Sequence, residues 1–147
     1  MELTALPTKK EREALLPLLT AAGLRLPDDL DYMAAIKTED GFAACGGTRG
    51  GVIEGVAADE RYRGEGLLGT LMTHLVGRLL GTGHDNIFLF TKPVNRSVFE
   101  PFGFRAVAAT ADALLMERRR DGASAYIASI PRVLPSGKDR IGAVVLN

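Results

Sequence analysis

The sequence predicts a mixed α/β domain of the α+β type, with a mostly antiparallel sheet flanked by helices. Three apolar runs separated by turn signals, at residues 33–38, 42–48 and 52–58, predict linked antiparallel strands. Residues 67–80 carry apolar side chains at spacings of three and four, which indicates a helix, and a β-rich run follows at 87–91. A strand, a helix and a strand in that order predict a parallel pair joined by a right-handed crossover.

Composition and charge limit the classes of function. The chain has 147 residues, 46% of them hydrophobic, which is enough for one domain with a buried core. Lys plus Arg and Asp plus Glu each number 18, so the net charge is zero and no basic face predicts nucleic-acid binding. The single cysteine, Cys45, lies in an apolar run that predicts a buried thiol, and no ligand cluster indicates a metal. Without a signal peptide or a membrane-spanning run, we expect a cytoplasmic protein.

The first thirty residues predict a strand and an interrupted helix. Residues 3–6 form the first expected strand, and Thr8 and Glu11 have the spacing of a capping box. Residues 15–22 give one apolar helical face, and Pro17 within it predicts a kink or a break into two short pieces. Residues 27–30 are expected to begin another short helical turn.

The part of the chain that follows the long helix predicts further strands and then a linker. Residues 105–109 and 113–116 are the last strands expected in the domain. A short helix is expected at 124–130, and the Pro-, Ser- and Gly-containing segment 131–139 predicts a linker. The apolar run 141–146 predicts a strand without an evident partner.

A polar loop with two glycines, residues 59–66, separates the strand at 52–58 from the helix. The first N–H groups of a helix lack partners and its dipole favours an anion there. Gly64 and Gly66 let a phosphate approach the backbone, and Arg61 and Arg63 add charge-assisted contacts. The loop therefore predicts a phosphate or pyrophosphate cradle, although glycine pairs also occur in ordinary turns. No Gly-Lys-Ser/Thr follows, so it is not a P-loop, and no acid stands at the ribose-binding distance of a dinucleotide motif.

Two motifs carry a resemblance to a known superfamily. Read as Arg-x-x-Gly-x-Gly, residues 61–66 resemble the coenzyme A pyrophosphate loop of GNAT acetyltransferases. Asn95 and the segment 99–104 are similar to the Asn…Tyr-Glu-x-x-Gly-Phe segment, in which Asn faces the coenzyme arm and Tyr the leaving thiolate. Phe99 departs from this pattern because it stands at the Tyr position and cannot donate a proton. The interval from Asn95 to Phe99 is also one helical turn shorter than usual.

Within this superfamily, residues 52–104 resemble one branch, the amino-terminal domains of citrate lyase ligases. The phrases Arg-Gly-Glu-Gly-Leu, Phe-Leu-Phe-Thr-Lys-Pro-Val-Asn and Phe-Gly-Phe carry this resemblance. Residues 141–147 resemble the opening strand of the adenylyl-transferring domain that follows in that branch. The resemblance implies a GNAT domain over residues 1–131, with 132–147 as a linker and the first strand of a nucleotidyltransferase-like domain.

The GNAT resemblance also implies an acyl-CoA site, with acetyl-CoA or CoA as the cofactor, held where the parallel strands splay apart. The residues that it implies for coenzyme contact are Val56, Ala57, Arg61, Tyr62, Arg63, Gly64, Glu65, Gly66, Leu67, Thr91, Asn95 and Phe99. Glu54 is the only titratable side chain on the strand before the loop and is the candidate base. His74, on the helix, and His84, in a turn, are expected to lie at the surface.

Three functions stay open at this stage. The first is an acetyltransferase that moves an acetyl group from acetyl-CoA to an amine. The second is a module that holds a CoA or dephospho-CoA arm without chemistry and assists acetylation of the citrate lyase acyl carrier protein; Phe99 at the Tyr position favours it. The third is an interaction domain whose loop binds no ligand. The expected partners are acyl-CoA and a small-molecule or carrier-protein acceptor, with no nucleic acid and no membrane.

Overall fold

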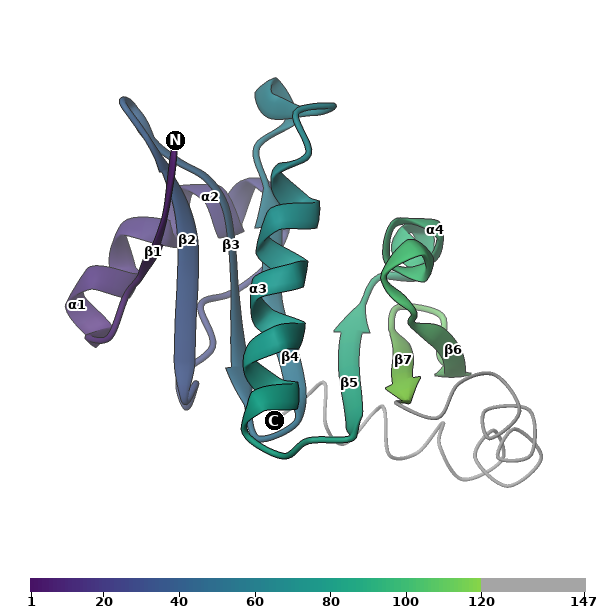
Figure 1. Ribbon diagram of the computed structural model, residues 1–147. Coiled ribbons are helices and arrows are strands. Elements are labelled where there is room, and N and C mark those ends of the chain that lie inside the picture. Colours follow the sequence, from purple (N-terminus) through teal and green to yellow (C-terminus); the bar gives the residue numbers. More distant parts are fainter. Residues whose placement is uncertain (120–147) are drawn as a thin grey trace. The chain divides into compact units, whose positions relative to one another are not determined.

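The computed structural model describes residues 1–119, which fall into two compact units. The first unit is Met1–Gly81, and the second begins at Thr82 (Figure 1). The helix expected at 124–130, the linker at 131–139 and the strand at 141–146 lie outside the described residues. The predicted domain boundary at residue 131 lies outside them as well.

The first unit contains an antiparallel sheet whose strands pair in chain order. They are β1 (Glu2–Ala5), β2 (Tyr32–Thr38), β3 (Gly41–Arg49) and β4 (Val52–Ala58). β2 pairs with β1 on one side and with β3 on the other, and β3 pairs with β4. These strands confirm the three predicted from alternating apolar runs, and the strand predicted at 3–6 is found one residue earlier.

The helix expected at 15–22 is interrupted, as Pro17 predicts. α1 (Lys9–Arg12), the 3₁₀ turn η1 (Glu13–Leu15) and α2 (Leu16–Ala21) follow one another. Pro17 lies in the first turn of α2, where the missing N–H costs no helical hydrogen bond. Thr8 caps α1, because its hydroxyl oxygen accepts a hydrogen bond from the Glu11 N–H at 3.1 Å.

The helical turn expected at residues 27–30 is wrong, because the structure has no helix there. Bonds to distant residues hold this segment in another conformation. The Arg12 guanidinium donates to the Leu30 carbonyl at 3.1 Å, and the Asp31 N–H donates to the Thr48 carbonyl at 2.8 Å. Leu30 is also buried, so tertiary contacts outweigh the local preference.

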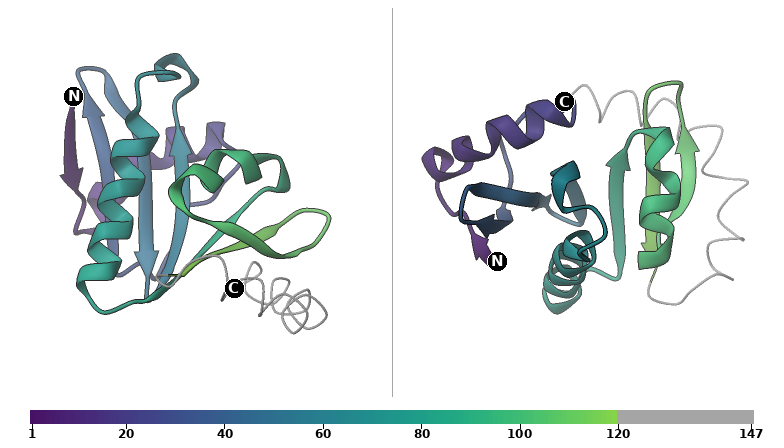
Figure 2. Two further views of the ribbon diagram at one scale, coloured as in Figure 1. Left: turned by 45° about the vertical axis from the view of Figure 1, so that its right-hand side comes forward. Right: turned by 90° about the horizontal axis from the view of Figure 1, so that it is seen from above.

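α3 (Leu67–Gly81) covers one face of this sheet, whereas α1 and α2 lie on the other (Figures 1 and 2). The helix buries Leu71, Met72, Leu75, Val76 and Leu79. A Cβ atom at Gly46 would lie 2.9 Å from Leu75 Cδ1, which is closer than Cβ contacts normally come. Glycine at this position of β3 therefore lets α3 approach the strand closely.

The opposite face of the sheet packs against α1, α2 and the segment that follows them. The buried residues of this cluster are Leu6, Leu15, Leu19, Leu30, Met33, Ala35, Cys45 and Ala57. Burial raises the pKa of the Cys45 thiol to about 12. Cys45 is therefore a protonated, structural thiol, as its apolar surroundings in the sequence predict.

The second unit contains strands on either side of a short helical segment. β5 (Asn86–Thr91) is followed by η3 (Pro93–Asn95), α4 (Arg96–Phe99) and η4 (Glu100–Phe102), and then by β6 (Arg105–Ala109) and β7 (Leu114–Arg119). β7 pairs antiparallel with both β5 and β6. The three strands predicted here are confirmed, and the last extends to Arg119. The parallel pairing expected between 52–58 and 87–91 would join the two units and stays a prediction.

Tyr32 and His74 tie α3 to β2 in the first unit. The Tyr32 hydroxyl and His74 Nε2 are 2.6 Å apart, and the Arg78 guanidinium carbon lies 3.8 Å from the centre of the Tyr32 ring. His74 is therefore partnered rather than freely exposed, in contrast to its expected place at the surface. Burial, and to a smaller extent the charge of Arg78, lower the pKa of His74.

We expect the first unit to lose stability as the pH falls below the usual imidazole pKa of 6.5. The folded chain binds the His74 proton less tightly than the unfolded chain. The stabilisation of the folded state by neutral His74 is therefore present above pH 6.5 and is lost on acidification. Urea unfolding at pH 5.5 and 7.5 measures it. His74→Gln should reduce the pH dependence, and equal pH dependence in His74→Gln and wild type would contradict this assignment.

Candidate functional site

The loop between β4 and α3 has the backbone conformation that its glycines predict. η2 (Glu60–Tyr62) follows Asp59, and both later glycines have positive φ, +87° at Gly64 and +73° at Gly66. A Cβ atom at either glycine would meet no protein atom within 4 Å. The space beside the loop backbone is therefore open, and the conformation itself is what requires glycine.

The first turn of α3 presents backbone donors without partners. The Gly66 carbonyl accepts the first helical bond, from the Thr70 N–H at 3.1 Å. The N–H groups of Gly66, Leu67 and Leu68 donate to no acceptor within residues 1–119. Together with the dipole of the 15-residue helix, these donors form a site suited to an anion.

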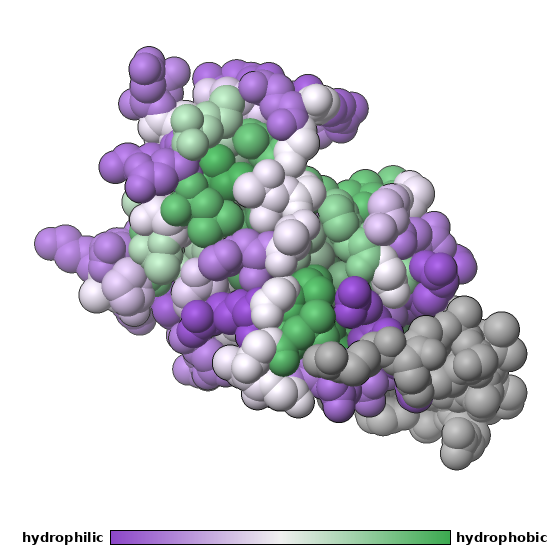
Figure 3. Space-filling view, in the orientation of Figure 1, coloured by the Kyte–Doolittle hydropathy of each residue, from purple (hydrophilic) through white to green (hydrophobic). Residues whose placement is uncertain are grey.

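Both arginines of the loop are ion-paired with acids of the same loop. Arg61 Nη2 lies 2.8 Å from Asp59 Oδ2, and Arg63 Nη2 lies 2.8 Å from Glu60 Oε2. The hydrogen bonds from Arg61 lower the pKa of Asp59. Figure 3 shows hydrophilic residues along the edge of the molecule where this loop lies. The arginines predicted to contact a phosphate are therefore present and exposed, with carboxylates as their present partners.

The candidate base Glu54 lies beside a bulge in β4. Gly55 has a φ of +66°, and the register of β3 with β4 shifts between Cys45 and Gly47. Glu54 Oε1 accepts a hydrogen bond from Arg49 Nη2 at 3.0 Å, whereas Oε2 is buried without a partner within the described residues. Glu54 therefore has one oxygen bonded to Arg49 and one buried oxygen without a hydrogen-bond partner among the described residues.

Val56 and Ala57, predicted to contact the coenzyme, use their side chains for packing. Val56 Cγ2 lies near Gly46 on the α3 side of the sheet, and Ala57 belongs to the buried cluster on the opposite side. Ala57 also faces Cys45 across the β3–β4 pair. Ala57 is buried, so any contact of Ala57 with a ligand would come from its backbone, whereas Val56 is half-buried.

The remaining predicted residues belong to the second unit. Asn95 Nδ2 donates to Thr91 Oγ1 at 3.2 Å, so these two side chains lie together at the end of β5. Phe99, at the position of the expected Tyr, is 4% exposed. Its ring is therefore buried.

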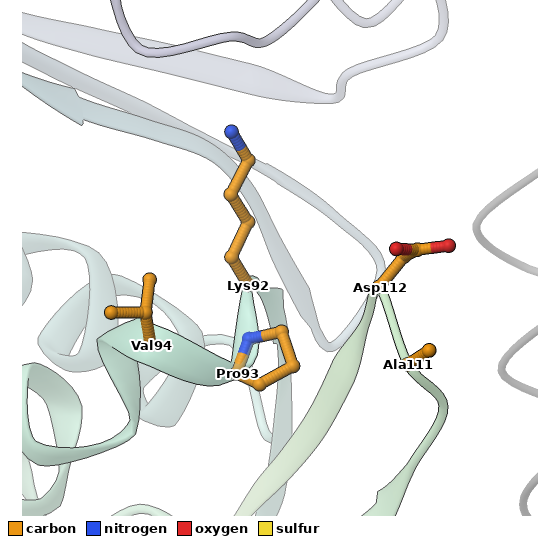
Figure 4. Close-up of a pocket in the computed structure, with 5 residues that line it drawn as sticks. All are labelled: Lys92, Pro93, Val94, Ala111 and Asp112. Atoms are coloured by element: carbon orange, nitrogen blue, oxygen red, sulfur yellow. The ribbon is translucent and has the colours of Figure 1, made fainter.

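A shallow hollow lies in the second unit next to these residues in the sequence. It has a volume of about 410 Å³ and is lined by Lys92, Pro93, Val94, Ala111 and Asp112 (Figure 4). The first three come from the segment after β5, and the last two from the turn between β6 and β7. None of the residues predicted from the sequence lines it.

A third glycine, Gly69, was not part of the predicted motif. With Gly64 and Gly66 it gives the spacing Gly-x-Gly-x-x-Gly, which sequence inspection could have found.

Within residues 1–119, no group of three or more His, Cys, Asp or Glu residues could hold a metal ion. Among the described helices, none combines the length and the apolar character needed to cross a lipid bilayer.

The acetyltransferase (GNAT) family model matches residues 22–104 of the sequence. The chain belongs to the GNAT acetyltransferase family. The matched segment contains the glycine loop of the first unit and the Asn95 segment of the second. The resemblance drawn from these two motifs is therefore confirmed at the level of the family.

Relatives of this GNAT chain include citrate (pro-3S)-lyase ligases. The ligase of Klebsiella pneumoniae is 33% identical over 97% of this chain, and that of Escherichia coli K12 is 28% identical over 84%. The chain spans only 42% and 35% of the lengths of these two proteins. These matches confirm the similarity to that branch.

Solved GNAT structures share the fold. Escherichia coli ElaA superposes with a TM-score of 0.65 at 19% identity, over 80% of this chain and 99% of that protein. An aminoglycoside 6'-N-acetyltransferase complexed with coenzyme A superposes with a TM-score of 0.67 at 11% identity, over 82% and 97%. At these identities the likeness shows the fold alone.

We expect Arg49→Met to lower the free energy of unfolding by about 1–2 kcal/mol, because it leaves a mostly buried carboxylate without a partner. Urea unfolding at pH 7.5 measures the change. The control is Arg49→Met combined with Glu54→Gln, which removes the uncompensated charge and should recover much of the loss. A single variant as stable as wild type would show that the Arg49–Glu54 pair contributes nothing.

Proposed function

We propose that this chain is an acetyl-CoA-dependent N-acetyltransferase domain that acts on an amine in the cytoplasm. The observation that carries the proposal is the loop at residues 61–67, with two glycines at positive φ and unpartnered N–H groups at the start of α3. Such a group of backbone donors suits the pyrophosphate of coenzyme A. Arg61, Tyr62, Arg63 and Glu65 would border the phosphates.

The position of Glu54 supports the same function. Glu54 lies five positions before Asp59, at the edge of the loop, which corresponds to roughly 16 Å along a strand. This is of the order of the length of an extended pantetheine arm. With its pyrophosphate at the loop, acetyl-CoA would lay its arm along the backbone of Val56 and Ala57 and bring its thioester near Glu54.

The proposed chemistry uses the unpartnered oxygen of Glu54. Transfer needs a base that removes a proton from the amine while its nitrogen attacks the thioester carbonyl. Glu54 Oε2 would accept that proton, and Arg49 would hold the other oxygen. Asn95 and Thr91, which are hydrogen-bonded to each other, are the further candidates for coenzyme contact.

A second candidate function is a module that binds a CoA or dephospho-CoA arm without chemistry. Phe99 favours it, because a phenyl ring that is 4% exposed cannot protonate a leaving thiolate. The similarity to citrate lyase ligases suggests the ligand: the prosthetic arm of a citrate lyase acyl carrier protein. In that case the ligase activity would belong to the remainder of a longer protein.

Changing both loop glycines tests the coenzyme site. We expect Gly64→Val with Gly66→Val to weaken acetyl-CoA binding by at least about tenfold, because the new side chains occupy the path to the backbone donors. Calorimetric titration with acetyl-CoA and dephospho-CoA measures it. Gly83→Val is the matched control, since Gly83 has a φ of +91° and open space around its Cβ position but lies in the second unit. Unchanged affinity in the double variant would refute the loop assignment.

Phe99→Tyr separates the two candidate functions. For the acetyltransferase we expect a higher rate of acetyl transfer with little change in acetyl-CoA affinity, because the new hydroxyl can protonate the thiolate. A panel of amines, with released CoA measured by a thiol reagent, provides the assay. For the binding module, the affinity for CoA or dephospho-CoA would stay unchanged, and neither the wild type nor Phe99→Tyr would transfer acetyl groups. The thermal midpoint of the variant controls for the cost of a buried hydroxyl.

A further inference from the structure

The glycine loop, residues 59–66, contains carboxylates that would compete with a bound phosphate for its two arginines. Arg61 contacts Asp59 through Nε, at 3.1 and 3.2 Å, and through Nη2, at 2.8 Å. Arg63 Nη2 lies 2.9 Å from Glu60 Oε1 and 2.8 Å from Oε2. Each guanidinium group is thus directed at a carboxylate two or three residues before it in the chain.

The backbone fixes one of these carboxylates in place. Asp59 Oδ1 also accepts the Arg61 N–H at 2.9 Å, so the side chain caps η2 and cannot swing away without losing that bond. Asp59 and the charge of Asp40, in the turn between β2 and β3, both raise the pKa of Arg61. Arg61 therefore lies in a field made mainly by carboxylates.

The charge balance of the loop opposes an anion. Residues 59–66 contain three acidic and two basic side chains, which gives a net charge of −1. The third acid, Glu65, has no ion-pair partner within the described residues. A phosphate that binds Arg61 or Arg63 must displace Asp59 or Glu60. The binding free energy gained is only the difference between the arginine–phosphate and the arginine–carboxylate contact.

We propose that Asp59 and Glu60 are positioning residues that set the phosphate affinity of this loop, by holding Arg61 and Arg63 until a ligand displaces them. The inference rests on the proposed binding of a pyrophosphate at the loop. Recognition then comes mainly from the backbone N–H groups at the start of α3, and the arginines contribute less than their number suggests. Weak, readily reversed binding of the coenzyme follows.

Neutralising either acid should tighten binding. We expect Asp59→Asn and Glu60→Gln each to raise the affinity for acetyl-CoA by about two- to fivefold, the range for exposed ion pairs. Asn retains an oxygen that caps η2, so the fold should be unaffected. Glu65→Gln is the matched control, because it removes the same charge from the same loop without releasing an arginine, and its effect should be smaller.

A double-mutant cycle separates release of the arginine from a change in net charge. In an Arg63→Met background, Glu60→Gln should no longer raise the affinity. The affinity of Asp59→Asn and Glu60→Gln should also fall more steeply with added salt than that of wild type, because the freed arginines then carry more of the binding. A purely structural role for these acids would not change the salt dependence.

Calorimetric titration of the full 147-residue chain with acetyl-CoA, at 50 and 300 mM NaCl, gives the result. Tighter binding in the two acid variants, with the gain from Glu60→Gln lost in the Arg63→Met background, supports the proposal. Wild-type binding that the acid variants do not improve, or that Glu65→Gln improves equally, overturns it and leaves the proposed function standing. If neither the wild type nor the variants bind acetyl-CoA, both this proposal and the proposed function are overturned.

Discussion

The close packing of α3 against β3 at Gly46 is the contact on which the position of the glycine loop, residues 59–66, depends. Because Gly46 has no Cβ, Leu71 and Leu75 lie directly over the strand. Each large side chain that α3 buries contributes about 1.5–3 kcal/mol relative to exposure. The helix start is thereby fixed in relation to the end of β4. The loop must turn within residues 59–66, and positive φ at its two glycines makes that turn feasible.

Most elements of the fold could be predicted because their signals are local. Alternating apolar runs gave the strands of the first unit, and the three- and four-residue spacing gave α3 almost to the residue. The error at residues 27–30 has a non-local cause. The carbonyl of Leu30 bonds to the side chain of Arg12, and Asp31 bonds to the strand at Thr48. Neither partner is visible in a short window of sequence.

The backbone features of the candidate site could be predicted from the sequence. Glycine spacing before a helix specifies positive φ and open donors, and the structure has both in the loop. Side-chain partners were not predictable. The sequence places Arg61 and Arg63 beside acids, but the choice between an acid and a ligand phosphate depends on rotamers and competing charges. The pairing of Arg49 with Glu54 likewise depends on the β3–β4 hairpin.

Binding and chemistry make different demands on this chain. A pyrophosphate at the start of α3 needs backbone donors, which are already exposed, and the release of two surface ion pairs, which costs little. Acetyl transfer needs particular side-chain atoms at particular places. Phe99 supplies no proton, and the free oxygen of Glu54 is buried, so an amine can reach it only after nearby side chains move. Binding of a coenzyme arm would therefore make fewer demands on this chain than catalysis, which would depend on access to a single carboxylate oxygen.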